Sequence, residues 1–156
     1  MTFRPVRNGD AEGLISLIER CFSEYQGVVV EPDGIDADLR AYATALENSG
    51  GEGFVLEQDD QIVALVSGVL LSKGRYQLKR IYLDSSLRGS GMGTKMLRLI
   101  ESRAVACGAV SIELWSDTRF ERAHRFYIRE GYEKTGHERT LGDLSNSIEY
   151  QFFKKL

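Results

Sequence analysis

The feature of this sequence that most restricts its fold is a glycine-rich turn between a strand-like and a helix-like segment. Ile81 and Leu83 end the strand-like segment, and three glycines follow at Gly89, Gly91 and Gly93. The apolar residues beyond them recur at helical spacing. Glycine lets the backbone turn sharply and approach a ligand, and the first amides of a helix lack partners within the helix. The stretch therefore predicts a phosphate site where a helix begins.

Three phosphate-binding motifs can be compared with this turn. A P-loop ends in Gly-Lys-Ser/Thr, whereas the order here is Gly93-Thr94-Lys95, so that motif fails. A dinucleotide fingerprint, Gly-x-Gly-x-x-Gly, is met only in part, because Thr94 stands in place of its third glycine. The third pattern, Arg-x-x-Gly-x-Gly, is met by Arg88, Gly91 and Gly93. On this stretch alone, a glycine turn without a ligand also stays open.

The composition is that of a folded, globular protein. Of the 156 residues, 42% are hydrophobic and 28% are charged, which argues against extensive disorder. A chain of this length is expected to form one domain, residues 1–156, and to bury about 70% of its unfolded surface. The net charge of −3 gives no basic footprint, so we expect no nucleic-acid partner.

Membrane and metal partners are not expected either. No signal peptide or membrane-spanning run is recognisable, which favours a cytoplasmic protein without a membrane partner. Cys21 and Cys107 each fall on an apolar helical face and lie far apart in the sequence. We expect two buried, reduced thiols rather than a disulfide or a metal site.

Apolar periodicity predicts an α+β order of elements along the chain. Asp10 can cap a first helix, and a hairpin turns at Asp59 and Asp60 before the strand that leads to the glycine turn. A later helix is expected to open with a capping box at Thr118–Glu121. Strands are expected at residues 2–6, 54–57, 62–71, from 75 to 83, 110–115, 132–139 and 148–153, and helices around residues 14–25, 35–46, 92–107 and 118–131.

The fourth predicted strand contains an irregularity. Its apolar residues alternate through Tyr76 and Leu78, but then continue at Ile81 and Leu83, so the alternation slips by one position. Such a slip is typical of a β-bulge, which we place around residues 79–80. A bulge re-aims the strand and frees backbone groups from the ladder.

A second motif lies behind the glycine turn. Ala123, Tyr127, Gly131 and Tyr132 match the pattern Ala-x-x-x-Tyr-x-x-x-Gly-Phe/Tyr. Together with Arg-x-x-Gly-x-Gly, this pattern resembles the GNAT family (GCN5-related N-acetyltransferases), which hold acetyl-CoA. The order of predicted elements agrees as well, so the resemblance extends over nearly the whole chain. A dinucleotide-binding fold would instead require further βαβ units where a β-hairpin is predicted.

The resemblance implies both a fold and an activity. The implied fold is α+β (α/β sandwich-like): a mixed, mostly antiparallel sheet of about seven strands, flanked by about four helices, with splayed central parallel strands. The implied activity is transfer of an acetyl group from acetyl-CoA to a primary amine of a small molecule, by direct attack and without an acyl-enzyme or a metal. Two alternatives stay open: a non-catalytic acetyl-CoA-binding sensor or docking module, and a protein N-terminal or lysine acetyltransferase. A homodimer is also open.

The resemblance also implies which residues bind the cofactor. A backbone N–H near Leu83 is the expected donor to the thioester oxygen. Phe120 stands where many relatives have an Asn that contacts the CoA arm. The cofactor-binding residues that we expect are Ile81, Tyr82, Leu83, Arg88, Gly89, Ser90, Gly91, Met92, Gly93, Thr94 and Phe120.

Three residues are candidates for catalysis. Tyr127 matches the family's general acid, although a phenol with a pKa near 10 donates uphill by about 2 kcal/mol to a thiolate whose conjugate acid has a pKa of about 8.5. Trp115 stands where relatives often carry a Glu that serves as base. Glu113 and Asp117 share its strand parity and could relay a proton through water. An ordinary charged residue on a strand face or at a helix entry is the alternative for each.

The acceptor side is implied to lie between two connections, residues 28–34 and 140–147. Glu31, Asp33 and Asp36, near Tyr25, would make this entrance acidic, which suits a cationic amine. A solvated acidic loop is the other interpretation.

Overall fold

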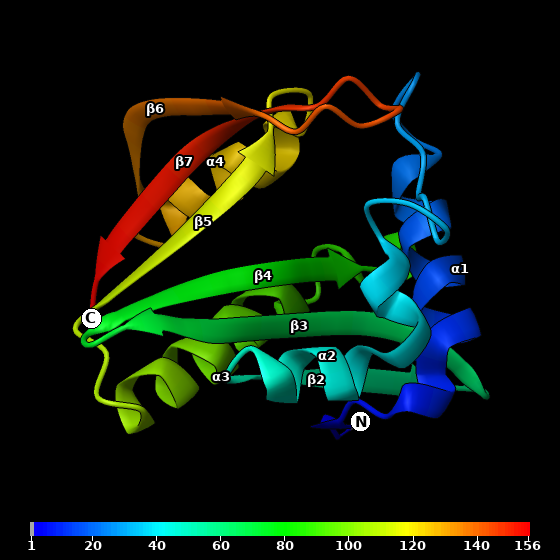
Figure 1. Cartoon of the computed structure of the whole chain (residues 1–156), viewed down its shortest axis with the longest axis horizontal. Coiled ribbons are helices and arrows are strands. Elements are labelled where there is room, and N and C mark those ends of the chain that lie inside the picture. The colour runs from blue at the N-terminus through cyan, green and yellow to red at the C-terminus, as the bar shows by residue number, and fades with distance from the viewer. Residues whose placement is uncertain (1) are drawn as a thin grey trace.

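The computed structural model describes residues 2–156, which form a seven-stranded sheet flanked by four α-helices (Figure 1). The strand order is β1-β2-β3-β4-β5-β7-β6. Only the β4–β5 pair is parallel, so the sheet is mixed and mostly antiparallel, which confirms the expected fold class. The strands are β1 (Arg4–Pro5), β2 (Gly51–Gln58), β3 (Gln61–Ser72), β4 (Arg75–Leu83), β5 (Ser111–Asp117), β6 (Glu133–Thr140) and β7 (Ile148–Lys155). The helices are α1 (Ala11–Phe22), α2 (Tyr42–Asn48), α3 (Met92–Ala106) and α4 (Glu121–Arg129).

The helices bury two separate hydrophobic cores, one on each face of the sheet (Figure 1). Leu14 and Leu17 of α1 pack with Leu46 of α2 against one face. Met96 of α3 and Tyr127 of α4 pack against the other. Because β3 lies between the two cores, eight of its twelve residues are buried. The amphipathic helices thus fold as their periodicity predicts.

Strand β4 carries the expected bulge. Ser67 pairs with Arg80 and Gly68 pairs with Leu78, so Lys79 has no partner in the β3 register. On the other edge, β4 pairs with β5 only from Arg75 to Gln77. Beyond that point the two strands diverge, as Figure 1 shows. The splayed central strands are confirmed.

Several local predictions were wrong or right only in position. The Thr118–Glu121 capping box does not form: Phe120 is the N-cap of α4, without a side-chain cap bond, and the Thr118 amide donates to the Ile148 carbonyl of β7. Asp10 is the N-cap of α1 but accepts from the Arg7 amide (2.8 Å) rather than from an α1 amide. The second helix begins with a 3₁₀ segment, Ala37–Ala41.

The two cysteines differ in exposure. Both are free thiols, as expected, but Cys107 is exposed and Cys21 is only partly buried. Cys107 ends α3 where the chain turns at Gly108, so its side chain leaves the apolar face of the helix. The expected burial of Cys107 was therefore wrong. None of the helices between residues 2 and 156 is long and apolar enough to cross a bilayer.

Candidate active site

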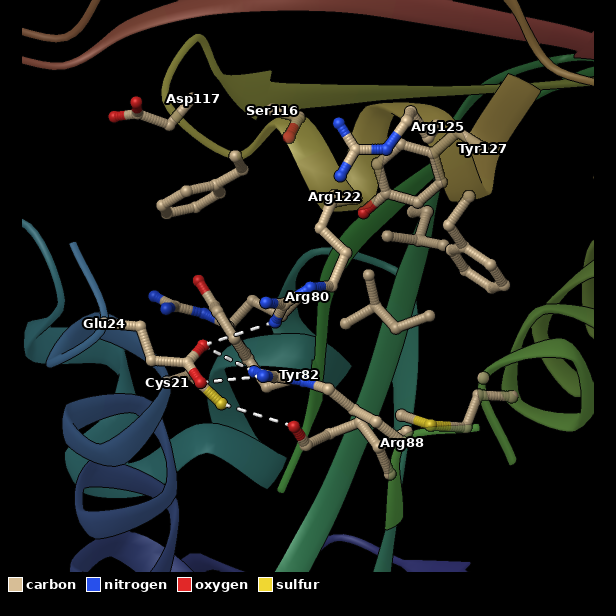
Figure 2. Close-up of a pocket in the computed structure, with 18 of the residues that line it drawn as sticks. Cys21, Glu24, Arg80, Tyr82, Arg88, Ser116, Asp117, Arg122, Arg125 and Tyr127 are labelled. Atoms are coloured by element: carbon tan, nitrogen blue, oxygen red, sulfur yellow. Dashed lines mark hydrogen bonds and ion pairs between the residues drawn. The ribbon is translucent and has the colours of Figure 1, made fainter. Parts of the chain in front are cut away.

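A cleft of about 600 Å³ opens where β4 and β5 diverge. Most of its lining comes from four parts of the chain: the end of α1, the second half of β4 with the glycine turn, the end of β5, and α4 (Figure 2). Glu149 of β7 lines it as well. The cleft therefore lies at the carboxyl ends of the two parallel strands. Ligands bind at that edge in open α/β sheets.

The glycine turn forms one end of this cleft. Gly89 (φ 75°) and Gly91 (φ 82°) both adopt the left-handed conformation, and Gly91 is the N-cap of the 15-residue helix α3. A Cβ on Gly93 would lie 3.2 Å from the Phe126 ring, so glycine also allows α4 to pack closely here. Thr94 lines the cleft with these three glycines. The unpaired first amides of α3 and its positive dipole end make this turn suitable for an anion.

Two expected cofactor residues lie outside the cleft lining. The Ser90 hydroxyl donates to the Leu87 carbonyl (2.5 Å) and closes the turn from outside. Met92 packs into the core between α3 and the sheet. Both residues therefore shape the turn rather than the surface of the cleft.

The second half of β4 forms the floor of the cleft. The Asp84 amide donates to the Val63 carbonyl of β3 (2.8 Å). Because backbone groups alternate along a strand, the amides of Ile81 and Leu83 point the other way, toward the edge that β5 has left. The Leu83 carbonyl on that edge accepts a hydrogen bond from the Cys21 thiol (3.6 Å). Main-chain groups of β4 thus face the cleft.

Tyr127 reaches the cleft from α4. Its ring packs against Tyr132 and Phe152 at centroid distances of 6.0 and 5.5 Å, and the side chain is only 5% exposed. The hydroxyl points into the cleft in Figure 2. Burial raises the pKa of this hydroxyl well above its usual value. Tyr127 is therefore a neutral hydrogen-bond donor.

Asp117 and Glu113, the two candidate bases, are placed differently. Asp117 lines the cleft, and Arg119 donates to its carboxylate from Nε (2.8 Å) and Nη2 (2.7 Å). Burial alone would raise the pKa of Asp117, but the guanidinium and amide of Arg119 outweigh it and lower the pKa.

Glu113 lies outside the cleft lining. Its carboxylate accepts from Arg75 (2.7 Å) and Trp115 (3.0 Å), at the point where β4 and β5 still pair. These bonds hold Glu113 between β4 and β5 and away from the cleft. The geometry therefore does not support a proton relay through Glu113.

Comparisons with known proteins agree with this arrangement. The model of the acetyltransferase (GNAT) family matches residues 12–132. The chain belongs to the GNAT family. A crystal structure of an acetyltransferase from Streptococcus agalactiae shares the fold, with a TM-score of 0.85 and 16% identity over 99% of this chain and 98% of that one. The PaiA N-acetyltransferase from Thermoplasma acidophilum, solved in complex with coenzyme A, aligns over 100% of both chains with a TM-score of 0.73 and 18% identity.

One curated relative matches a shorter stretch. An aminoalkylphosphonate N-acetyltransferase of Salmonella typhimurium is 32% identical over 59 residues. This match spans 38% of the length of each protein. Family membership therefore rests on the family model, which also confirms that the protein is a GNAT enzyme.

The GNAT motif on α4 holds cleft residues that the sequence analysis did not select. Arg122, Arg125 and Arg129 all line the cleft. Their spacing of three and four residues puts them on one face of a helix, which is a signal that the sequence does contain. Cys21 and Glu24, at the end of α1, line the cleft as well, but no sequence pattern singles them out.

Aromatic residues close the cleft on the α1 side. Phe120 contacts Tyr25 and Phe22, with ring centroids 4.7 and 5.9 Å away, and the ring of Tyr82 meets Phe22 edge-on at 5.7 Å. Phe120, expected against the CoA arm, therefore also joins α4 to the end of α1. This wall includes Tyr25, which was expected near the acceptor entrance.

The expected acidic entrance is not found among the described residues. Asp36 pairs with Arg80 (3.1 Å), and Asp33 pairs with Arg40 (2.7 Å). Glu31 accepts from the Leu144 amide (3.1 Å), which joins the two connections that were expected to shape the acceptor side. These three carboxylates are therefore bound by other residues of the protein, and they lie outside the cleft lining.

Proposed function

We propose that this GNAT enzyme transfers an acetyl group from acetyl-CoA to the primary amine of a small molecule, by direct attack of the amine and without an acyl-enzyme. One observation carries the proposal. The opening between β4 and β5 ends at the glycine turn on one side and meets the Tyr127 hydroxyl on the other. The expected diphosphate site and the candidate acid would therefore share a single cleft.

The residues of the cleft fit acetyl-CoA. The turn has glycine at positions 89, 91 and 93, so no side chain covers the first amides of α3. Nothing lies within 4 Å of a Cβ built on Gly89 or Gly91, which leaves open space beside the turn. The turn amides, with Arg88, would hold the diphosphate, and the edge of residues 81–83 would lie along the pantetheine arm. Acetyl-CoA supplies an acetyl group activated as a thioester.

Two groups of the protein serve the charge that develops during transfer. The Leu83 amide faces the cleft and would donate to the thioester oxygen. The loss of one such donor costs about 3 kcal/mol in other enzymes. Tyr127 would donate to the leaving sulfur as the carbon–sulfur bond breaks and the carbon–nitrogen bond forms. Because the raised pKa of Tyr127 disfavours full proton transfer, its hydrogen bond is the main contribution.

The acceptor amine must be neutral when it attacks the thioester. An alkylamine with a pKa of about 10.4 costs about 4.6 kcal/mol to deprotonate at pH 7. Asp117 is a weak base because Arg119 lowers its pKa. The bound ammonium must therefore lose its proton to water before it attacks. Activity should therefore rise with pH through the titration of the bound amine.

A small acceptor is supported by the relative that acetylates aminoalkylphosphonates, which matches over 38% of this chain. The cleft lining adds a charge argument. It contains six cationic side chains, Lys79, Arg80, Arg88, Arg122, Arg125 and Arg129, against three carboxylates, Glu24, Asp117 and Glu149. An anionic group beside the amine would suit this balance, so an aminoalkylphosphonate is the second acceptor class to test.

Thiol release from acetyl-CoA, followed with an amine panel at several pH values, tests the proposal. The panel holds alkylamines, an aminoalkylphosphonate, a polyamine and N-terminal and lysine peptides. Release with a small amine, faster at higher pH, is expected. Release with peptides alone would replace the proposal by protein acetylation. Binding of CoA without release from any amine would replace it by a sensor role.

A further inference from the structure

Arg88, at the glycine turn, is held by a carboxylate from a distant part of the chain. Glu24 follows α1 and accepts two hydrogen bonds, from Nη1 (2.7 Å) and Nη2 (2.5 Å) of Arg88. Figure 2 shows this fork across the cleft. Arg122 of α4 lies 3.7 Å from the same carboxylate. The hydrogen bonds from Arg88 lower the pKa of Glu24, so it is ionised at neutral pH.

Glu24 differs from the other two carboxylates of the cleft. Asp117 is paired with Arg119, and Glu149 is paired with Arg139 (2.7 Å). Neither of those arginines lines the cleft, so a ligand in the cleft leaves both pairs intact. The partner of Glu24 is itself a residue that a phosphate would recruit. Glu24 is thus the carboxylate whose ion pair the cofactor disturbs.

Glu24 and a diphosphate at the glycine turn would compete for the guanidinium of Arg88. A guanidinium binds carboxylate and phosphate through the same planar set of N–H groups, and Glu24 already takes Nη1 and Nη2 of Arg88. A diphosphate at the α3 amides would also add negative charge to the turn whose Arg88 is already bound by Glu24. The carboxylate would therefore leave Arg88 as the diphosphate binds.

We propose that Glu24 leaves Arg88 when acetyl-CoA binds and then holds the cationic amine of the acceptor. This inference rests on the proposed function. Phe22 and Tyr25 flank Glu24 in the chain and line the cleft with Phe120. A carboxylate beside aromatic faces recognises an ammonium by charge and by cation–π attraction. Binding is then ordered: the cofactor enters first and completes the acceptor site.

The variant Glu24→Gln tests both halves of this proposal, because it keeps the shape of the side chain and removes its charge. Freed Arg88 should bind the cofactor better, so the Kd of CoA measured by calorimetry should fall by about 2-fold to 5-fold. The acceptor KM should rise at least about 10-fold, because the ammonium loses its partner. In the Arg88→Gln background, Glu24→Gln should change the CoA Kd less.

Glu52→Gln is the matched control. Glu52 forms a similar fork with Arg103 (2.5 and 3.2 Å), but both side chains lie outside the cleft. This variant should leave the CoA Kd and the acceptor KM unchanged, and thermal unfolding of both variants checks that they fold.

Each outcome separates the two proposals. If the wild type does not bind CoA in calorimetry, the proposed function itself fails. If the wild type binds CoA and Glu24→Gln binds it equally or more weakly, the competition for Arg88 is wrong. Tighter CoA binding with an unchanged acceptor KM would overturn the acceptor role of Glu24.

Discussion

The two sides of the cleft contribute different chemistry. On the β4 side, the donors expected to serve the thioester and the diphosphate are main chain, the Leu83 amide and the amides after Gly91, beside the side chains of residues such as Arg88. On the α4 side they are side chains, chiefly the Tyr127 hydroxyl and the arginines of its helix. Main-chain donors can be removed only by changing the backbone, whereas side-chain donors can be removed atom by atom. The two sides should therefore respond differently to substitution.

The two sides of the cleft also differ in how deeply their strands are buried. Strand β3 is buried along most of its length and holds β4 through a nearly continuous antiparallel register. Strand β6, at the far edge of the other side, is exposed throughout. The main-chain donors thus belong to a strand held in the centre of the sheet. Such donors are preorganised for the charge that they stabilise.

The largest effect is expected from Gly91→Glu on the main-chain side. An L-residue at φ 82° is strained by about 1–2 kcal/mol, and the carboxylate would occupy the expected diphosphate site. We expect no CoA binding in calorimetry at millimolar ligand. Gly108→Glu is the matched control, because Gly108 has the same φ and equally open surroundings at the other end of α3. Normal CoA binding by Gly91→Glu would show that the turn is not the phosphate site.

The second effect tests the side-chain side. Tyr127→Phe removes one hydroxyl and keeps the packing, so kcat should fall about 10-fold to 1,000-fold while the KM of acetyl-CoA changes little. Tyr132→Phe is its control: this ring packs beside Tyr127, and its buried hydroxyl has no hydrogen-bond partner within residues 2–156. Steady-state rates under conditions where chemistry limits turnover decide the matter. An unchanged kcat for Tyr127→Phe would remove its acid role.

The third effect concerns the junction where the two sides separate. Gly68 of β3 lies opposite the β4 bulge, and a Cβ there would meet Tyr76 at 2.3 Å and the Gln77 carbonyl at 2.9 Å. Gly68→Ala should lower the free energy of unfolding by about 1–3 kcal/mol, because the core at the junction is overpacked. Gly9→Ala, where nothing lies within 4 Å, should stay within about 0.5 kcal/mol. Denaturant unfolding of both variants measures the difference. Equal stability would mean that the junction is loosely packed.

The sequence predicts this junction well because its signals are local. The alternation of apolar residues slips by one position between Leu78 and Ile81, because the side chains that are buried change face there. The bulge could therefore be placed within two residues. The GNAT fold and enzyme class followed from two motifs in the right order and are confirmed. The roles of Tyr127 and the turn residues remain predictions that the geometry supports.

What the sequence could not predict depends on tertiary partners. The Thr118 amide is taken by β7, so the capping box loses to sheet pairing. Glu113 shares strand parity with Asp117, but Arg75 of the neighbouring strand binds it away from the cleft. Glu24 meets Arg88 across 64 residues of chain, a distance over which no local pattern extends. Ion pairs between distant segments therefore decide which carboxylates reach the cleft.

The smallest effect concerns Asp84, which follows β4 and caps the 3₁₀ segment Ser85–Leu87 before the glycine turn. Its carboxylate accepts from the Ser86 amide (3.1 Å) and hydroxyl (2.8 Å) and from Arg20 of α1 (2.9 Å). These bonds, those from Ser86 first, lower the pKa of Asp84 in the folded state. A lowered pKa stabilises the fold above the unfolded pKa of about 3.9, and this stability is lost as pH falls through the folded value.

Asp84→Asn keeps the shape of the cap but removes its charge. It should therefore lower the free energy of unfolding by about 1 kcal/mol at pH 7, the excess of a charged over a neutral hydrogen bond. The difference from wild type should shrink below about pH 4, where the wild-type carboxylate also becomes neutral. Asp33→Asn, at an exposed pair with Arg40, should change stability by less than about 0.5 kcal/mol at either pH. If the difference in the free energy of unfolding between Asp84→Asn and the wild type were instead independent of pH, the cap would act through its shape alone. Packing rather than charge would then hold the end of β4 in position.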